Sequence, residues 1–117
     1  MTSWEWAESL DALEAAPGTH RLLFENGDVR VLETRIAPGE TTDVHTHRWP
    51  GILYVQSFGH FVRRDGEGAV LVDTRGGAEL PEPGTAIWTG ALPPHSLENV
   101  DTREISVIGV ELKRASS

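Results

Sequence analysis

The chain contains no cysteine, so it forms no disulfide and offers no thiolate to a metal ion. Any bound metal must therefore be held by histidine nitrogen or by oxygen. Basic residues are also scarce, since 10 Lys and Arg stand against 18 Asp and Glu and give a formal net charge of −8. Nucleic acids and anionic membranes are bound by basic surfaces, so we expect neither as a partner.

Long apolar segments are absent as well. No apolar run approaches the roughly 18 residues that a membrane-spanning helix needs. The first residues, MTSWEW, have neither the basic start nor the apolar centre of a signal peptide. We therefore expect a cytoplasmic protein. With 117 residues, the chain has the size of one domain, and we predict a single domain over residues 1–117.

Helical periodicity is confined to the N-terminal segment. Thr2 and Glu5 have the spacing of a capping box, and Pro17 ends the pattern. The apolar residues that recur at helical spacing are Trp6, Leu10 and Leu13. We predict one short helix over residues 3–16, outside the rest of the fold.

From residue 20 onward, short extended segments alternate with turns. Asn26-Gly27 is a strong hairpin signal, and Pro83-Gly84 and Pro93-Pro94 are among the other turn signals. The predicted strands cover residues 21–24, 29–36, 44–47, 52–57, 60–64, 69–73, 85–89, 95–100 and 104–112. Many short strands separated by Gly and Pro turns predict an all-β sandwich or barrel, here over residues 20–113.

Three histidines carry the clearest chemical signal. His45 and His47 are two residues apart on a predicted strand, so their imidazoles lie on one face with Cα atoms about 6.5–7 Å apart. Two ring nitrogens at that spacing can bind one ion at about 2.0–2.2 Å each. A His-x-His pair alone is weak evidence for a metal site. His95, taken alone, is typical of a surface residue beside a turn.

The residues around these histidines resemble the two motifs of the cupin family. The first motif is matched by Gly39, His45, His47, Tyr54, Val55 and Gly59, and the second by Pro83, Gly84, His95 and Asn99. The resemblance covers residues 27–112 and implies a small single-domain bacterial cupin, similar to the cupins grouped with β-alanine catabolism. The implied fold is an all-β double-stranded β-helix, or jelly-roll barrel, with one short N-terminal helix. The resemblance further implies that His45, His47 and His95 bind a metal ion in the barrel mouth.

One position departs from the cupin pattern. The family's fourth ligand is a glutamate just before the Tyr-Val segment, where this chain has Gly51 or Ile52, depending on the alignment. Neither residue can bind a metal. A three-histidine site leaves a divalent ion more electrophilic and leaves more positions for water, oxygen or a chelating substrate, as in the thiol and diketone-cleaving cupin dioxygenases. The alternative is a barrel that has lost its metal and keeps the histidines for substrate binding.

Further candidates have plainer alternative interpretations. Tyr54 and Gln56 are candidate catalytic residues. The candidates for substrate binding are Trp49, Trp88, Gln56 and Asn99, each of which also suits a core, sheet or turn position.

Two more histidines and three arginines complete the set of candidates. His60 is a candidate replacement for the missing ligand, and we expect His20 at the surface. The arginines that could bind an anionic substrate are Arg30, Arg63 and Arg64, although exposed arginines are common on strands.

The leading functional prediction is a metal-dependent enzyme that acts on a small polar molecule. The cofactor is a divalent ion, Fe(II) in preference to Zn, Ni or Mn, and the favoured activity is that of a three-histidine dioxygenase. Metal-assisted isomerase, cyclase or lyase chemistry is an alternative, because the fold supports many reactions. A non-catalytic small-molecule-binding cupin is the second interpretation. We expect a homodimer, since cupins commonly dimerise through their sheets.

Overall fold

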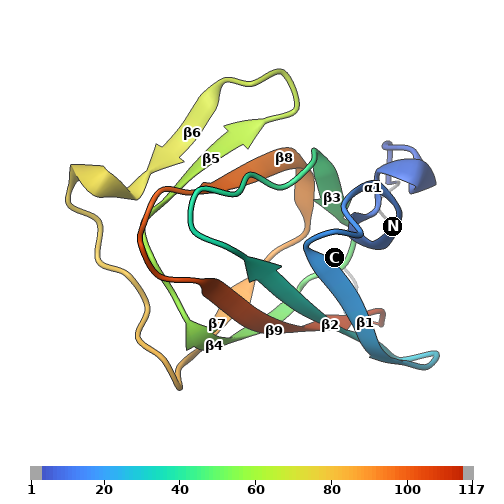
Figure 1. Ribbon diagram of the computed structural model, residues 1–117. Helices are drawn as coiled ribbons and strands as arrows, with labels where there is room; N and C mark the ends of the chain where they lie inside the picture. Colours follow the sequence, from blue (N-terminus) through green and yellow to red (C-terminus); the bar gives the residue numbers. More distant parts are fainter. Residues whose placement is uncertain (1–3, 115–117) are drawn as a thin grey trace.

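The computed structural model describes residues 4–114, which form two antiparallel sheets that enclose a barrel (Figure 1). The five-stranded sheet consists, in spatial order, of β1 (His20–Glu25), β2 (Val29–Ile36), β9 (Ile105–Leu112), β4 (Gly51–Ser57) and β7 (Ala86–Thr89). The four-stranded sheet consists of β3 (His45–His47), β8 (Leu92–Asn99), β5 (Phe61–Asp65) and β6 (Val70–Asp73), and the short 3₁₀ turn η2 (Thr74–Gly76) follows it. The predicted all-β fold is confirmed. Thr2, the first residue of the predicted capping box, lies outside the described residues.

Side-chain alternation along the strands places the core between the two sheets. On β4, for example, Val55 is fully buried while Tyr54 is 45% exposed on the opposite face. The buried apolar residues that the two central strands β2 and β9 contribute are Leu32, Ile36, Ile105 and Val107. One face of each sheet is therefore available to line an interior site.

The N-terminal segment differs from the single helix predicted over residues 3–16. The structure contains two short turns, the 3₁₀ turn η1 (Glu8–Leu10) and the α-helical turn α1 (Ala12–Ala15), separated by Asp11. Asp11 has an extended ψ of 143°, and its carboxylate accepts hydrogen bonds from Nη1 and Nη2 of Arg30 on β2 at 2.9 and 2.8 Å. This tertiary ion pair fixes Asp11 as the N-cap of α1 and interrupts the helical path. Within residues 4–114, no helix has the length and apolarity needed to cross a membrane.

Pro93 and Pro94 lie inside β8, whereas the sequence placed them in a turn. In the β3–β8 pair, His45 is opposite His95 and His47 is opposite Leu92, so β8 contains one extra residue between the two pairs. Proline lacks a backbone N–H and is tolerated at such a bulge. The bulge brings the Pro93 carbonyl oxygen within 2.8 Å of Nδ1 of His95.

Candidate metal centre

Four histidines from β1, β3 and β8 meet inside the barrel. The His45 ring lies next to the other three, with ring centroids 4.5 Å from His20, 5.0 Å from His47 and 4.4 Å from His95. The potential ligand atoms of His20, His45 and His47 all lie within 4.8 Å of one another. A three-histidine group could therefore hold a divalent ion, and the tightest group contains His20. His95 extends the cluster beyond this group, and its ring centroid lies 5.7 Å from that of His47.

The strand register explains why these residues converge. His45 and His95 are cross-strand partners, so their side chains share a face. His47 lies on the same face as His45 because side chains alternate along β3. His20 opens β1 opposite Thr34 of β2 and faces the interior from the other sheet. The prediction that His20 lies at the surface is wrong, since only 5% of this residue is exposed.

Every ring in the cluster is oriented by a hydrogen bond at Nδ1. The four pairs are His20–Ala16 O at 3.1 Å, His45–Asp43 O at 2.7 Å, His47–Glu111 Oε2 at 2.9 Å and His95–Pro93 O at 2.8 Å. Carbonyl and carboxylate oxygens accept hydrogen bonds, so Nδ1 of His45, His47 and His95 donates and carries the proton. Nδ1 of His20 also lies 3.0 Å from the Thr19 hydroxyl, which can donate or accept. Nε2 of His45, His47 and His95 then keeps its lone pair, which is the arrangement found in histidines that bind metals.

Burial also keeps three of the rings neutral. Desolvation, reinforced by the neighbouring imidazoles, lowers the pKa of His20 to about 3 from the usual 6.5. The same cause lowers the pKa of His45 to about 4 and the pKa of His95 to about 3. Because metals bind the neutral imidazole, these rings are in the binding form at neutral pH.

The position of the missing motif glutamate is sterically closed. Gly51 faces the interior, but a Cβ at this position would overlap the backbone carbonyl oxygen of Val110. Ile52, the other alignment position, faces outward and is 40% exposed. Neither position can direct a carboxylate to the histidines without moving the backbone.

A carboxylate instead enters from the neighbouring strand. Glu111 of β9 is the cross-strand partner of Gly51 and is buried. Its Oε1 accepts a hydrogen bond from Nε of Arg30 at 2.8 Å, and its Oε2 accepts one from Nδ1 of His47 at 2.9 Å. Both oxygens are engaged, so Glu111 orients His47 from outside the group of His20, His45 and His47. Arg30, expected to be an exposed strand residue or an anion binder, is buried between Glu111 and Asp11.

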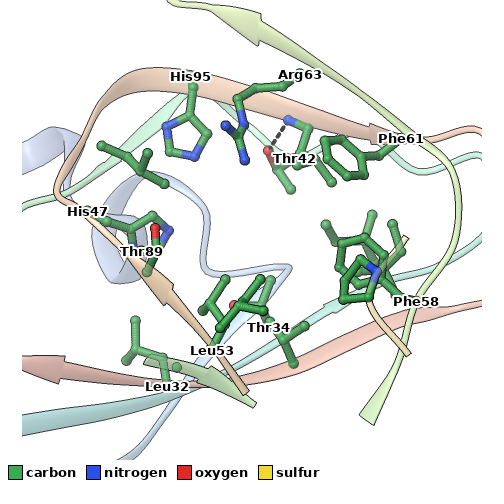
Figure 2. Close-up of a pocket in the computed structure, with 18 of the residues that line it drawn as sticks. Leu32, Thr34, Thr42, His47, Leu53, Phe58, Phe61, Arg63, Thr89 and His95 are labelled. Carbon is green, nitrogen blue, oxygen red and sulfur yellow. Dashed lines mark hydrogen bonds between the residues drawn. The ribbon is translucent and has the colours of Figure 1, made fainter. Parts of the chain in front are cut away.

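A cavity of about 350 Å³ adjoins the histidines between the two sheets (Figure 2). Its wall is mainly apolar, and the residues that form it include Leu32, Leu53, Phe58, Phe61, Val72, Leu97 and Val107. Trp49, a predicted substrate-binding residue, lies in this wall. Besides the histidines, the charged or ionisable side chains that line it are Arg63, Glu79 and Glu111.

Three of the predicted site residues face away from the cavity. Tyr54 and Gln56 alternate with the inward residues of β4 and lie on the outer face, where Gln56 accepts a hydrogen bond from Ser106 at 2.8 Å. Trp88 lies on the same face and is 63% exposed. The strand period explains the error, because the sequence does not show which face of β4 and β7 points inward.

Two further candidates have structural roles. Asn99 is fully buried, and its Nδ2 donates to the carbonyl oxygens of Ile36 and Arg103, which makes it a support for the neighbouring turn. His60 lies apart from the cluster, and its Nδ1 is 3.0 Å from Oγ1 of Thr74.

Sequence reasoning missed His20 and Glu111. His20 had no signal from its own strand, because Leu22, two residues further on, is 43% exposed. Glu111 continues the alternating series Val107 and Gly109, which makes it an acidic residue on an otherwise apolar face.

Comparisons with known proteins identify the fold. No family model and no curated protein matches the chain. A cupin domain from Bordetella pertussis Tohama I matches with a TM-score of 0.61 and 21% identity, over 80% of this chain and 91% of that one. A conserved protein with a double-stranded β-helix domain from Klebsiella pneumoniae matches with a TM-score of 0.55 and 16% identity, over 96% and 95% of the two chains.

A third solved structure agrees with these two. A cupin superfamily protein from Desulfitobacterium hafniense DCB-2 matches with a TM-score of 0.50 and 13% identity, over 80% of this chain and 74% of that one. The narrower resemblance to cupins grouped with β-alanine catabolism stays a prediction. The protein is therefore a small barrel with the cupin fold, and the histidine cluster inside it could hold a metal ion.

Proposed function

We propose that the protein is a metal-dependent enzyme that acts on a small polar molecule in the cavity beside the histidine cluster. The observation that carries this proposal is the convergence of four imidazoles, three of them buried and that of His47 half-buried, each with Nδ1 hydrogen-bonded. Within residues 4–114 no ring nitrogen of the cluster is both buried and without a partner, so the second nitrogen of each ring opens toward the cavity that the four rings line. Ligation of a shared ion would use the lone pairs of His20, His45 and His47 together.

The donor set fits a divalent ion. Imidazole nitrogen suits Fe, Zn and Ni, and we favour Fe(II) and a dioxygenase-like activity, as in the three-histidine cupins. His20, His45 and His47 would hold the ion, with His95 as the alternative or additional ligand. When bound, such an ion supplies Lewis-acid polarisation and positions for oxygen-containing ligands.

The protein's own contribution is orientation and exclusion of water. Glu111 and Arg30 hold the His47 ring, while backbone carbonyls hold the other three rings. The apolar wall, which includes Leu53 and Phe61, keeps the bound molecule away from bulk water. Metal-assisted isomerase, cyclase or lyase chemistry would use the same arrangement.

A metal titration tests the proposal. Chelator-treated protein should bind Zn(II) or Co(II) with submicromolar affinity, measured by calorimetry and by the visible spectrum of bound Co(II). His45→Ala should weaken binding most, by about 100-fold or more, because His45 is the shared neighbour of the other three rings. The matched control is His60→Ala, which removes a histidine outside the cluster and should leave the affinity unchanged.

Two further variants identify the remaining ligands. If the tightest group is the site, His20→Ala should weaken metal binding as much as His47→Ala, and His95→Ala should weaken it less. Oxygen consumption by the anaerobically Fe(II)-loaded protein with a panel of small substrates then tests the oxygenase activity. A wild-type protein that binds no divalent ion at micromolar concentration would contradict the proposal and favour a small-molecule-binding barrel.

A further inference from the structure

Arg63 is a cation placed in the apolar wall of the cavity. It lies on β5, and its cross-strand neighbours are Leu97 on β8 and Val72 on β6, both of which also line the cavity. Figure 2 shows its guanidinium beside the His95 ring, with both groups directed into the cavity. The Phe61 ring lies below the guanidinium at 5.8 Å. The charge therefore reaches the interior at the edge of the histidine cluster.

The guanidinium lacks the carboxylate partners that Arg30 and Arg64 have. Among residues 4–114, Nε of Arg63 is the one buried side-chain nitrogen or oxygen without a hydrogen-bond partner. Arg64, the next residue, pairs with Glu98 at 2.9 Å, and the buried Arg30 has two carboxylates. Arg63 forms no salt bridge within this part of the chain.

Arg63 is half-buried, and its Nε is buried in an apolar wall without a partner, which is destabilising for the free protein because the desolvation is not offset by a counter-charge. Such a group indicates that its partner comes from outside the chain. We propose that Arg63 binds the carboxylate of a small organic acid, and that this acid is the molecule on which the histidine site acts. The second half of this statement rests on the proposed function, whereas binding of the carboxylate does not.

The composition of the cavity favours a monocarboxylate over a phosphate. Arg63 is the one Arg or Lys that lines the cavity within the described residues, so the cavity matches one negative charge. Glu79 and Glu111 also line it and would repel a dianion. The planar carboxylate fits the paired N–H groups on the Nε side of a guanidinium, and the remaining wall fits an apolar body.

The size and geometry define the rest of the ligand. A cavity of about 350 Å³ is at the small end of ligand sites. Because Arg63 and His95 lie side by side, a donor atom close to the carboxylate would reach the histidine cluster (Figure 2). The expected class is a short organic acid with a hydroxyl, carbonyl, amine or thiol near its carboxylate and an apolar remainder.

The charge requirement can be tested with simple probes. Benzoate and butyrate are titrated into the full-length chelator-treated protein by calorimetry at millimolar concentration, together with benzamide, butyramide and inorganic phosphate. Each carboxylate should bind at least about tenfold more tightly than its amide, since a charge-assisted hydrogen bond is replaced by a neutral one. Equal affinity for acid and amide, tighter binding of phosphate, or no binding of either acid would overturn the proposal.

Matched variants assign the effect to Arg63. Arg63→Met and Arg63→Gln should each lose the preference for carboxylate over amide, while Arg64→Gln, the neighbouring arginine on β5, should keep it. Arg63→Met should also melt at or above the wild-type temperature, because it removes an unpaired charge from an apolar wall. A lower melting temperature in both Arg63 variants would show a structural role and would contradict the proposal. Retained preference in the Arg63 variants would do the same.

The same proteins separate this inference from the metal proposal. Zn(II) titration of Arg63→Met should give the wild-type metal affinity, since Arg63 is not among the imidazole donors. If wild type binds carboxylates but no metal, the proposed enzyme fails and the anion site stands. If it binds metal but shows no preference for carboxylates, the anion site fails and the metal centre stands.

Discussion

Burial and hydrogen bonding act on the pKa of the buried histidines in opposite directions, and burial is the larger effect. Burial disfavours the protonated ring, whereas the backbone carbonyls that bond to Nδ1 favour it and orient each ring. His20, His45 and His95 are therefore neutral in the folded protein, whereas in the unfolded chain they would have an ordinary histidine pKa near 6.5.

This difference in pKa predicts acid sensitivity of the metal-free protein. The pKa of these three histidines lies at about 3 to 4 when folded, so between pH 6.5 and about 4 only the unfolded chain binds protons at these positions. The free energy of unfolding should decrease as the pH falls through this window, by up to about 1.4 kcal/mol per pH unit for each histidine, and should not depend on them above it. Urea denaturation of chelator-treated protein measures the slope.

The control for this prediction is a variant that replaces one imidazole by a polar side chain that does not titrate. His45→Gln should have a shallower slope of stability against pH than wild type. An identical slope in wild type and variant would mean that other groups cause the acid sensitivity.

At the scale of elements, a chain of ionic contacts attaches the N-terminal segment to the site. Asp11 pairs with Arg30, Arg30 pairs with Glu111, and Glu111 holds His47. The same segment supplies the Ala16 carbonyl that orients His20. The short helical turns are therefore part of the support of the metal centre.

Removing the first member of this chain should affect both stability and metal binding. Asp11→Ala leaves the buried Arg30 with one carboxylate and removes the cap of Leu13, so we expect a loss of about 2 kcal/mol in the free energy of unfolding. The control is Glu33→Ala, which breaks an exposed pair with Arg21 and should cost less than about 1 kcal/mol. Chemical denaturation measures both, and weaker Zn(II) binding in Asp11→Ala alone is also expected. Equal effects of the two variants would contradict the anchoring role.

At the scale of the whole molecule, a row of apolar side chains crosses the outer face of the five-stranded sheet. Register places one residue of each strand in a continuous row, which consists of Phe24, Val31, Val110, Ile52 and Trp88. Phe24 is 54% exposed and Trp88 is 63% exposed. A row of this kind is unusual on an isolated surface and typical of a protein interface.

We expect a second copy of the chain to cover this face, in agreement with the predicted homodimer. Five strands at about 4.8 Å spacing and about 20 Å in length give a face of roughly 24 by 20 Å. Side chains that project from the sheet increase the accessible area of this face. That brings the area toward the roughly 800 Å² that each partner contributes to a standard interface. An apolar face also pairs with itself across a two-fold axis, which needs no second kind of surface.

Sedimentation velocity tests the dimer. Trp88→Glu should shift a wild-type dimer to monomer, because it places a charge at the end of the apolar row. Leu71→Glu is the control, since Leu71 is 56% exposed but lies on β6 of the other sheet, and this variant should remain dimeric. A monomeric wild type at micromolar concentration would contradict the prediction, as would dissociation caused by the control alone.

The sequence by itself determined the strands, the barrel and the location of the chemistry. Alternating short apolar segments and Gly or Pro turns are local properties, so the strands could be predicted from neighbouring residues alone. The pair His45 and His47 could be recognised for the same reason, because two-residue spacing on a strand fixes a shared face. His95 followed from the motif resemblance, and the structure places its ring beside that of His45.

Tertiary structure alone decided which side of each strand faces the interior and which distant residues complete the site. Strand period gives two faces but does not say which is buried, and for that reason Tyr54, Gln56 and Trp88 were placed wrongly. His20 and Glu111 join the site through pairing of strands far apart in the chain, which no local pattern encodes. The predicted helix over residues 3–16 is wrong for the same reason. An ion pair between Asp11 and Arg30, 19 residues further along the chain, sets the backbone conformation at Asp11.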